Sequence, residues 1–388
     1  MQYRRFGKLD WQPSALGFGC MRLPTLEGRP MSENIDEQQA VAMIRHAIDQ
    51  GVNYVDTAYP YHGGKSETVV GQALKDGYRQ KVKLATKSPV WFIQKPEDFN
   101  KYLNEQLEKL QTDYIDFYLL HALDREKWEN IILKHNVLAQ AEAAVRDGRI
   151  KHIGFSFHDD YAAFQQIVDG YEGWDFCQIQ YNYMDTENQA GTKGLKYAAA
   201  KGLGVIIMEP LLGGKLANPP APLQGLFDQA PAERTPADWA LQWLWNQPEV
   251  SLVLSGMSTL EQVNSNISSA DQSGVGALTP QDLAFIEAVQ QKYRERTAIP
   301  CTKCSYCMPC PNGVDIPKNF EIYNDGFMHQ DEASARWTYS RFIGESERAG
   351  CCVGCKVCEE QCPQKIAISD LLPQVHQVLG EGKSYLSK

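Results

Sequence analysis

Residues 54–87, YVDTAYPYHGGKSETVVGQALKDGYRQKVKLATK, contain the pattern that decides the fold. The β-branched and aromatic run Tyr54–Ala58 predicts a strand, and Lys83–Lys87 predicts another. Between them, Ser66–Lys75 is amphipathic and predicts a helix. When a helix separates two strands in this way, the strands run parallel and the helix crosses over one face of the sheet. The stretch therefore predicts one strand–helix–strand unit of a parallel sheet.

The same alternation extends outward from this unit, and we count eight strand–helix units within residues 1–296. Eight units in a segment of this length fit a (β/α)8 TIM barrel, whose typical size is ~250 residues. A doubly wound open sheet is the alternative, but Arg22 stands where the third glycine of a dinucleotide-binding turn would be needed. The expected strands are Ala15–Cys20, Tyr54–Ala58, Lys83–Lys87, Ile115–His121, His152–Phe157, Phe176–Tyr181, Val205–Glu209 and Ser251–Gly256. The expected helices are Asp36–Gln50, Ser66–Lys75, Pro96–Leu110, Val137–Arg146, Tyr161–Val168, Gly194–Lys201, Thr235–Asn246 and Thr259–Ser268.

The chain of 388 residues is long enough for two domains, and its cysteines are unevenly distributed. Nine of the eleven fall between Cys301 and Cys362, whereas Cys20 and Cys177 are isolated and suit small packing positions. The change in composition divides the chain into two predicted domains, residues 1–296 and residues 297–388.

Charge and hydropathy exclude several function classes. The net charge of −10 argues against nucleic acid as a partner, because phosphate recognition needs an excess of Lys and Arg. The N-terminal sequence MQYRRFGKLD lacks the apolar core of a signal peptide, and no stretch approaches the ~20 apolar residues that cross a bilayer. We therefore expect a cytoplasmic chain with no membrane partner, in which a cysteine cluster indicates a metal or redox site rather than disulfides.

Five motifs give the predicted barrel a family resemblance. They are VDTAYPYHGGKSE (55–67), LATK (84–87), LLHA (119–122), IGFSF (153–157) and QIQYN (178–182). In these motifs the chain resembles the aldo-keto reductases, which are TIM-barrel enzymes that use a nicotinamide cofactor to interconvert carbonyl compounds and alcohols. Carried over position by position, the resemblance implies the catalytic residues Asp56, Tyr61, Lys87 and His121.

These four residue types suit the reduction of a carbonyl group. The reaction needs a hydride at carbon and a proton at oxygen, and a free tyrosine with a pKa of ~10 gives up its proton poorly at neutral pH. The ammonium of Lys87 is expected to lower the pKa of Tyr61, and Asp56 is expected to keep Lys87 charged and oriented. Tyr61 would then be the general acid, and His121 would orient the substrate carbonyl.

The resemblance also implies residues that hold NADH or NADPH. Ser156 and Gln178 match the positions that contact the nicotinamide carboxamide, and Met208 stands where an aromatic residue often stacks on the ring. The segment SGMSTLEQVNSN (255–266) is similar to the one that holds the adenosine half of the cofactor. It contains no Lys or Arg for the 2′-phosphate of NADPH, so both NADH and NADPH remain candidates. The candidate residues in this segment are Gly256, Met257, Ser258, Gln262 and Asn266.

Two cysteine motifs dominate the C-terminal region, CTKCSYCMPCP (301–311) and CVGCKVCEEQCP (352–363). The second has the C-x2-C-x2-C-x3-C-P spacing of bacterial ferredoxins, which bind [4Fe–4S] clusters, and the first is one residue shorter. In two-cluster ferredoxins the fourth cysteine of each motif serves the other cluster. Applied here, this rule gives one cluster Cys301, Cys304, Cys307 and Cys362, and the other cluster Cys352, Cys355, Cys358 and Cys310.

A pair of zinc sites is the alternative, because C-x2-C pairs also bind zinc. A C-x2-C-x2-C run that ends in C-P is typical of iron–sulfur ligation rather than of zinc, so we favour iron–sulfur. The intervening residues Ile316–Phe342 predict helix, and the region resembles the helical ferredoxin-like modules of multi-component oxidoreductases. Taken together, the two parts resemble a subfamily of predicted aldo-keto reductases with a C-terminal ferredoxin-like region.

Three hypotheses describe how the two predicted parts work. In the first, the barrel reduces a small aldehyde or ketone, or oxidises the alcohol, while the clusters stabilise the fold or sense redox state. In the second, the clusters exchange electrons between the barrel substrate and an external partner such as ferredoxin. In the third, the chain is a non-catalytic electron-transfer or regulatory subunit. Aromatic residues that could line the substrate pocket are Trp11, Trp91 and Phe92.

Overall fold

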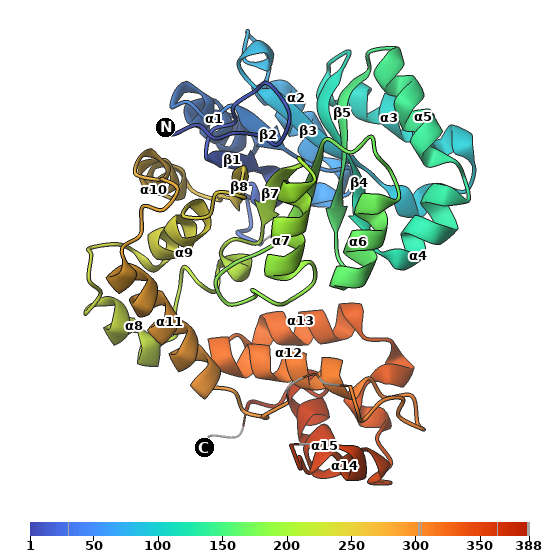
Figure 1. Ribbon diagram of the computed structural model, residues 1–388, viewed down its shortest axis with the longest axis vertical. Helices are drawn as coiled ribbons and strands as arrows, with labels where there is room; N and C mark the ends of the chain where they lie inside the picture. Colours follow the sequence, from blue (N-terminus) through green and yellow to red (C-terminus); the bar gives the residue numbers. More distant parts are fainter. Residues whose placement is uncertain (30, 302, 304, 363, 386–388) are drawn as a thin grey trace. The chain divides into compact units, whose positions relative to one another are not determined.

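The computed structural model describes residues 1–385 apart from Pro30, Thr302, Cys304 and Pro363 (Figure 1). The chain forms two compact units. The first contains residues 1–217 and 233–283, and the second contains residues 218–232 and 284–388. Helix α11 (Pro280–Glu295) spans the change from one unit to the other, so the predicted domain boundary at residues 296 and 297 stays a prediction.

The first unit is built on a closed barrel of eight parallel strands, as predicted. Each strand pairs with its neighbours in chain order, and β1 closes the barrel by pairing with β8, with Phe18 opposite Ser255. Parallel strands of a closed barrel present their carboxyl ends at one face, which is where the site residues of such barrels lie. The strands are β1 (Leu16–Gly19), β2 (Tyr54–Asp56), β3 (Lys83–Ser88), β4 (Ile115–Leu123), β5 (Ile150–Phe157), β6 (Phe176–Gln180), β7 (Gly204–Met208) and β8 (Leu252–Gly256).

The helices of this unit begin with recognisable caps. Asp36 and Thr235 each accept a hydrogen bond from a backbone amide in the first turn of their helix, at 3.0 and 3.1 Å. The sequence did not predict the short helix α4 (Arg125–Lys127) or the π-helical turn Trp128–Leu133 that follows it. The other helices are α1 (Glu37–Asp49), α2 (Ser66–Ala73), α3 (Pro96–Leu110), α5 (Val137–Arg146), α6 (Tyr161–Asp169), α7 (Gly191–Ala200), α9 (Pro236–Trp245) and α10 (Leu260–Asp271).

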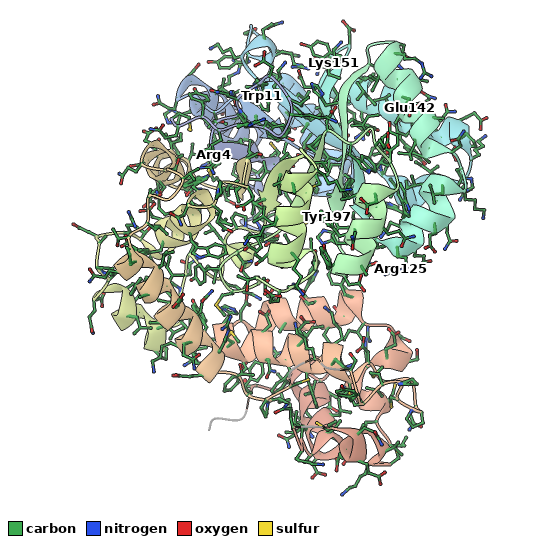
Figure 2. All side chains as sticks on the ribbon, in the orientation of Figure 1. Arg4, Trp11, Arg125, Glu142, Lys151 and Tyr197 are labelled. Atoms are coloured by element: carbon green, nitrogen blue, oxygen red, sulfur yellow. The ribbon has the colours of Figure 1, made fainter. Side chains whose placement is uncertain are left out.

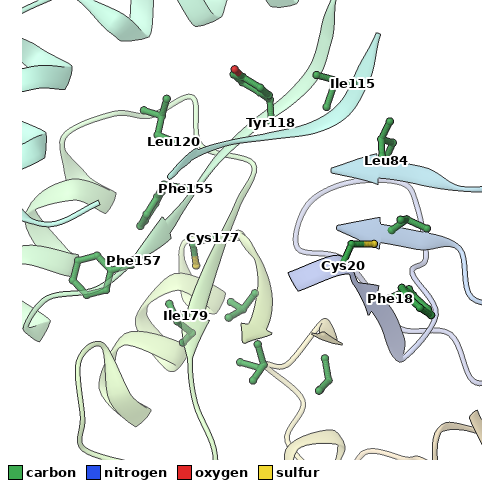
Figure 3. Packing of buried hydrophobic residues seen from close by; sticks show 14 of the residues in the cluster. Phe18, Cys20, Leu84, Ile115, Tyr118, Leu120, Phe155, Phe157, Cys177 and Ile179 are labelled. Atoms are coloured by element: carbon green, nitrogen blue, oxygen red, sulfur yellow. The ribbon is translucent and has the colours of Figure 1, made fainter. Parts of the chain in front are cut away.

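The core of the first unit lies between the barrel and its helices (Figure 3). Phe155, Phe157 and Ile179 are fully buried there. Cys20 and Cys177 belong to the same cluster and are also fully buried, and burial raises the pKa of both thiols. The two isolated cysteines therefore lie in packing positions, where a neutral thiol behaves as a small apolar side chain.

A second cluster fills the barrel interior near the beginnings of the strands. Phe6 and Phe117 pack with ring centroids 5.2 Å apart, and Trp11 packs on both, at 5.4 and 5.2 Å. Tyr54 and Phe176 complete the group. We expected Trp11 near the substrate, and that prediction was wrong, because the N-terminal segment carries this ring to the opposite end of the barrel from the carboxyl ends of the strands.

Arg4 fastens the N-terminal segment to the C-terminal end of α9 (Figure 2). Its guanidinium donates to the carbonyl oxygens of Val250, Trp245 and Gln247, at 2.7, 2.9 and 2.7 Å. A cation is favourable at the end of a helix, where carbonyl groups lack partners within the helix. Burial lowers the pKa of Arg4 to about 10, so the side chain stays charged at neutral pH.

The second unit is helical, as predicted, and no strand occurs in the part of it that the structure describes. Left-handed Gln330 ends α12, so one predicted helical stretch becomes two helices. Phe320, Tyr339 and Leu372 are buried in its core together with Cys358 and Cys362. Its helices are α8 (Ala221–Phe227), α12 (Ile316–His329), α13 (Glu332–Phe342), α14 (Val357–Gln361) and α15 (Ile368–Leu379). None of the helices in the described ranges has the length and apolar character needed to cross a membrane.

Candidate active site and cysteine clusters

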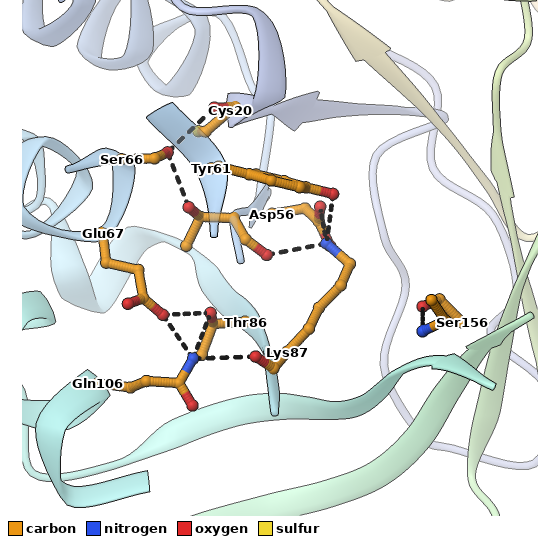
Figure 4. Close-up of polar contacts among 11 residues, drawn as sticks. Cys20, Asp56, Tyr61, Ser66, Glu67, Thr86, Lys87, Gln106 and Ser156 are labelled. Atoms are coloured by element: carbon orange, nitrogen blue, oxygen red, sulfur yellow. Dashed lines mark hydrogen bonds and ion pairs between the residues drawn. The ribbon is translucent and has the colours of Figure 1, made fainter. Parts of the chain in front are cut away.

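The four predicted catalytic residues come together at the carboxyl ends of three consecutive strands, and Figure 4 shows three of them, Asp56, Tyr61 and Lys87. Asp56 ends β2, Tyr61 lies in the turn that follows, and Lys87 lies near the end of β3. The Lys87 ammonium donates to Asp56 Oδ1 at 2.6 Å and to the Tyr61 hydroxyl oxygen at 3.3 Å. It also donates to the carbonyl oxygen of Thr57 at 2.8 Å. One buried cation therefore connects a carboxylate to a phenol.

His121, near the end of β4, completes the group. Its ring centroid lies 6.1 Å from that of Tyr61. The next residue, Ala122, has a left-handed φ of 53°, and the register between β4 and β5 shifts at this point. Its amide donates to Ser156 Oγ at 2.7 Å. A bulge re-aims side chains at a barrel rim, so this irregularity and its hydrogen bond set the orientation of His121.

Burial and neighbouring charges give the four groups different protonation states. Burial raises the pKa of Tyr61 more than the Lys87 ammonium lowers it. We expected a lowered pKa for Tyr61; the contribution of Lys87 has that sign, but burial outweighs it. Burial lowers the pKa of Lys87, yet Asp56 and Tyr61 raise it by more, so the amine stays charged. Burial and the Lys87 charge hold the pKa of His121 well below its usual value, so its ring is neutral.

A second network, which the sequence did not reveal, holds the strand ends that carry these residues (Figure 4). In the first turn of α2, Ser66 hydrogen-bonds Thr57 at 2.8 Å and donates to the carbonyl of Cys20 at 3.0 Å. The adjacent Glu67 is completely buried and accepts a hydrogen bond from Thr86 at 2.7 Å. One helix turn thus ties the ends of β1, β2 and β3 together.

Gln106 of α3 extends this network to the backbone of Lys87, the predicted catalytic lysine. Its side-chain nitrogen donates to Glu67 Oε1 at 2.5 Å and to the carbonyl oxygen of Lys87 at 3.1 Å. The Tyr118 hydroxyl donates to its amide oxygen at 2.7 Å. In the sequence, only Ser66 and Glu67, the last two residues of the motif at residues 55–67, pointed to this hydrogen-bond network. Hydrogen bonds between residues far apart in the chain leave no periodic pattern in the sequence.

Two aromatic side chains lie beside the catalytic group. The Trp91 ring is 5.1 Å from the His121 ring, and Phe92 contacts Trp91 at 5.8 Å. Trp91 is 37% exposed and Phe92 is 47% exposed. Large apolar side chains that stay exposed beside polar catalytic groups are typical of a ligand site.

The predicted carboxamide contacts lie on neighbouring strands. Ser156 and Gln178 are buried and are paired in register across β5 and β6. Ser156 Oγ already accepts a hydrogen bond from Ala122, whereas Gln178 Oε1 has no hydrogen-bond partner among the described residues. Met208 is half-buried at the end of β7. A buried amide oxygen without a partner has an unmet hydrogen bond that a bound ligand would satisfy.

The predicted adenosine-binding residues lie at the end of β8 and in α10. Gly256 is exposed, whereas the Met257 side chain is fully buried in the core. Ser258 donates through its backbone amide to Gln262 Oε1 at 2.8 Å. Asn266 is buried and donates to Ser255 Oγ at 2.9 Å. Several of these side chains therefore hold the segment itself in shape.

In the second unit, three of the predicted cluster ligands line one cavity. Cys301, Cys307 and Cys362 come from both ends of the unit's sequence. The rest of the wall is mainly apolar. Cys304, the fourth residue predicted for this cluster, lies outside the described residues. The other lining residues are Ser305, Ile316, Pro317, Phe320, Gln364, Ile366 and Ile368.

The remaining predicted ligands lie around Cys358. Burial raises the pKa of the Cys358 thiol, and Glu359, Cys310 and Cys352 raise it further because they lie close enough to repel its negative charge. The side chain of Asn312, the residue after the first motif, donates to Cys355 Sγ of the second motif at 3.8 Å. Cys355 is exposed. Thiols of both motifs are thus interleaved in space.

Comparison with known proteins settles the family. Residues 15–290 match the sequence model described as the aldo/keto reductase family. The chain belongs to this family. Residues 300–368 match the model of a 4Fe-4S dicluster domain, so this aldo/keto reductase carries an iron–sulfur domain after its barrel, as its sequence suggested.

Characterised relatives and solved structures cover the barrel of this aldo/keto reductase. L-galactose dehydrogenase of Arabidopsis thaliana is 27% identical over an alignment of 317 residues, which covers 76% of this chain and 97% of that protein. The holo form of aldo-keto reductase AKR11C1 from Bacillus halodurans is 27% identical, with a TM-score of 0.61 over 74% of this chain and 96% of that chain. An aldo-keto reductase from Klebsiella pneumoniae in complex with NADPH is also 27% identical, with a TM-score of 0.60 over 74% and 95%.

Proposed function

We propose that this oxidoreductase reduces a small aldehyde or ketone, or oxidises the corresponding alcohol, with Tyr61 as general acid and base. The observation that carries the proposal is the Lys87 ammonium, which hydrogen-bonds both Asp56 and Tyr61 within the barrel. The neutral ring of His121 lies beside the same phenol. A proton donor, a charge that stabilises its conjugate base and a second hydrogen-bond donor therefore face one small volume.

In this proposal each residue has a separate task. The Tyr61 hydroxyl gives its proton to the substrate oxygen, and Lys87 stabilises the phenolate that remains. Asp56 holds Lys87 in place, since an isolated ammonium in this buried position would lose its charge. His121 donates an N–H to the substrate oxygen without adding a positive charge next to Lys87.

NADH or NADPH supplies the hydride when bound. Two observations support a nicotinamide site at the carboxyl ends of the strands. The first is Gln178 Oε1, which is buried and has no partner among the described residues. The second is the structural likeness to an aldo-keto reductase that was solved with NADPH. The segment after β8 contains no Lys or Arg, so the preference between the two cofactors is part of what an experiment must measure.

The test is the substitution Tyr61→Phe, with Tyr59→Phe as its matched control. Tyr59 lies two residues away, and its hydroxyl donates to Glu105 at 3.0 Å, outside the catalytic group. We expect Tyr61→Phe to reduce kcat by about 10²- to 10⁴-fold, the usual contribution of a positioned acid, and Tyr59→Phe to change it little. Equal kcat values for Tyr61→Phe and the wild type would refute the assigned mechanism and favour a non-catalytic role for the barrel.

We further propose that the second unit binds two [4Fe–4S] clusters with interleaved ligands. One would be held by Cys301, Cys304, Cys307 and Cys362, and the other by Cys352, Cys355, Cys358 and Cys310. The cavity shared by Cys301, Cys307 and Cys362 supports the first set, and the proximity of Cys310 and Cys352 to Cys358 supports the second. The donor chemistry fits, since thiolates that repel each other are stabilised by bound iron.

Iron and sulfide analysis of anaerobically purified protein tests the cluster number. Two clusters require about eight iron and about eight sulfide per chain, with a broad absorbance band near roughly 400 nm. Half these amounts would indicate one cluster. Colourless protein with stoichiometric zinc would overturn the iron–sulfur assignment in favour of tetrahedral zinc sites.

A second candidate function is electron exchange with an external one-electron carrier. One observation favours it: Cys355 is exposed, and the flanking Val353 and Val357 are 68% and 50% exposed. An apolar surface next to an exposed cluster ligand suits transient contact with a redox protein. The test is an anaerobic mixture of enzyme, reduced ferredoxin and a carbonyl substrate without nicotinamide. Alcohol formed in it would support this function, and its absence would leave the nicotinamide reaction as the proposal.

A further inference from the structure

His62 directly follows Tyr61, the proposed general acid, and the networks described above do not include it. It lies in the turn Tyr61–Gly64, and its side chain is fully buried. Its backbone is left-handed, with a φ of 52°. Few residues other than glycine adopt this conformation, although histidine does so more often than most. The fold therefore places a polar ring in the interior, where each ring nitrogen needs a hydrogen-bond partner.

Both ring nitrogens of His62 hydrogen-bond the backbone of the segment that follows β1. Nε2 lies 3.2 Å from the amide nitrogen of Leu23, and Nδ1 lies 2.7 Å from the carbonyl oxygen of Ser32. These partners define the tautomer, because an amide N–H can only donate and a carbonyl oxygen can only accept. Nε2 is therefore the acceptor, and Nδ1 carries the proton. Burial lowers the pKa of His62, which favours this neutral form of the ring.

The two hydrogen bonds join the loop that carries Tyr61 to a neighbouring connection of the barrel. Residues 57–65 connect β2 to α2, whereas Leu23 and Ser32 lie between β1 and α1. The β1–α1 connection has a fixed shape of its own, because Thr25 and Ile35 form an antiparallel bridge within it. His62 is thus held by backbone groups whose own positions are defined by the chain.

The remaining contacts of the loop show why its middle needs this support. Ser66 holds the beginning of the loop through its 2.8 Å hydrogen bond with Thr57. Among the described residues, the Tyr61 hydroxyl has one hydrogen bond, from Lys87 at 3.3 Å, which is longer than a typical hydrogen bond of this kind. The position of the phenol therefore depends on how firmly the backbone beside it is held, and His62 holds that backbone.

We propose that His62 is a positioning residue for Tyr61, and that its two hydrogen bonds to the β1–α1 connection keep the phenol directed at the substrate oxygen. This inference rests on the proposed function. Proton transfer requires a donor and an acceptor about 3 Å apart, and a misplacement of ~1 Å can cost on the order of 10²-fold in rate. Because its ring is buried and both nitrogens are occupied, His62 acts through Tyr61 and not on the substrate.

The test separates the hydrogen bonds of His62 from its backbone conformation. His62→Gly removes the ring and suits the left-handed φ, whereas His62→Asn tolerates the same φ and keeps an amide that can donate or accept. We expect His62→Gly to reduce kcat for carbonyl reduction by roughly 10- to 100-fold, with a change in KM of less than about threefold. His62→Asn should recover part of the lost kcat.

Gln111→Gly is the matched control for the backbone change. Gln111 is exposed, caps the C-terminal end of α3 and has a left-handed φ of 53°. The substitution gives glycine the same conformation without removing a buried ring, so kcat should stay within about twofold of the wild-type value. If His62→Gly does not fold, the same comparison is made with His62→Asn, and thermal melts of each variant identify that case.

A double variant shows whether His62 acts through Tyr61. With Tyr61→Phe in place, adding His62→Gly should lower kcat by less than about twofold, because the effects of residues that act as a unit do not add. If the two losses in kcat multiply in full, or if His62→Gly keeps the wild-type kcat while Tyr61→Phe is impaired, the inference is wrong. If Tyr61→Phe itself keeps the wild-type kcat, the proposed function fails.

Discussion

The catalytic face of the barrel and the cysteine region hold their functional groups in opposite ways. At the catalytic face, Lys87 is 1% exposed and has three hydrogen-bond acceptors supplied by the chain. Around Cys358, the near neighbours Glu359, Cys310 and Cys352 all disfavour the thiolate. The barrel pairs its own charges, whereas in the second unit neighbouring groups disfavour the thiolate of Cys358.

Because of this difference, we expect the folding of the two units to depend on bound groups to different extents. The barrel has a large core and a closed sheet, so we expect its predicted site to form without a bound ligand. The second unit is small, and two of its predicted ligands, Cys358 and Cys362, belong to its core. When predicted metal ligands also form the core, the binding free energy of the metal group becomes part of the folding free energy.

The largest expected effect is the unfolding of the second unit while the first unit stays folded. We expect Cys358→Ala, or removal of iron by a chelator under air, to unfold the second unit while the barrel keeps its structure. Calorimetry should then show the loss of one transition and the retention of another, together with bleaching near roughly 400 nm. Cys351→Ser is the matched control, because Cys351 is exposed and is outside the predicted ligand sets. If both units unfolded together, the barrel would not be independent of the metal group, and the predicted difference between the units would be wrong.

The next effect is a broken charge pair in the barrel. Lys87→Met leaves the Asp56 carboxylate buried without its partner, which should cost about 3–5 kcal/mol of the free energy of unfolding. Activity should fall by about 10²- to 10⁴-fold because the Tyr61 phenolate loses its stabilising charge. Denaturant melts and kcat measure the two effects. The double variant Asp56→Asn with Lys87→Met should regain stability but not activity; recovery of both would show that the charges only hold the fold together.

A smaller effect is expected when the hydrogen-bond network that holds the backbone of Lys87 is disrupted. Gln106→Leu removes hydrogen bonds to Glu67, Thr86 and the Lys87 carbonyl. We expect a loss of about 2–4 kcal/mol in stability, because buried polar groups lose their partners, and a fall in kcat of less than about tenfold. Gln140→Leu, on the outer helix α5, serves as the control for the same change of side chain. A kcat loss as large as that of Lys87→Met would give Gln106 a direct catalytic role.

The smallest effect is a pH dependence that only the barrel should show. The pKa of His121 lies well below its usual value in the folded state, whereas the unfolded chain has the ordinary value of ~6.5. Below pH ~6.5 the unfolded chain therefore binds the extra proton, and stability should fall by up to about 1.4 kcal/mol per pH unit. His121→Asn should reduce this slope between about pH 6.5 and 5.5, and the rest of the slope should come from His62 and His158, whose pKa values burial also lowers. An unchanged slope would assign the loss to other groups.

The strand ends predicted from the sequence lie within two residues of the observed strand ends. Alternating apolar runs and helix caps are local signals, and the motif at residues 55–67 placed Asp56 and Tyr61 beside Lys87. The shift at Ala122 was not predicted, because a bulge depends on the register of two strands. Helix α8, within a stretch rich in Pro and Gly, was also missed. The prediction for Trp11 was wrong because its position in the sequence does not show at which end of the barrel its side chain packs.

The raised pKa of Tyr61 and the contacts of His62 show what sequence patterns lack. The sign of the Lys87 effect on Tyr61 follows from charge alone, but the larger contribution of burial depends on how much protein surrounds the phenol. His62 and its partners Leu23 and Ser32 belong to different strand–helix connections. Only the pairing of β1 with β2 brings these connections side by side.

The hydrogen bonds that Ser66 and Glu67 form with three strand ends have a consequence for protein engineering. They fix both ends of the loop at residues 57–65, which carries Tyr61, so insertions or deletions in that loop would pull against β1, β2 and β3 together. A library that seeks new substrates should therefore leave the length of the first loop unchanged and vary length elsewhere around the rim.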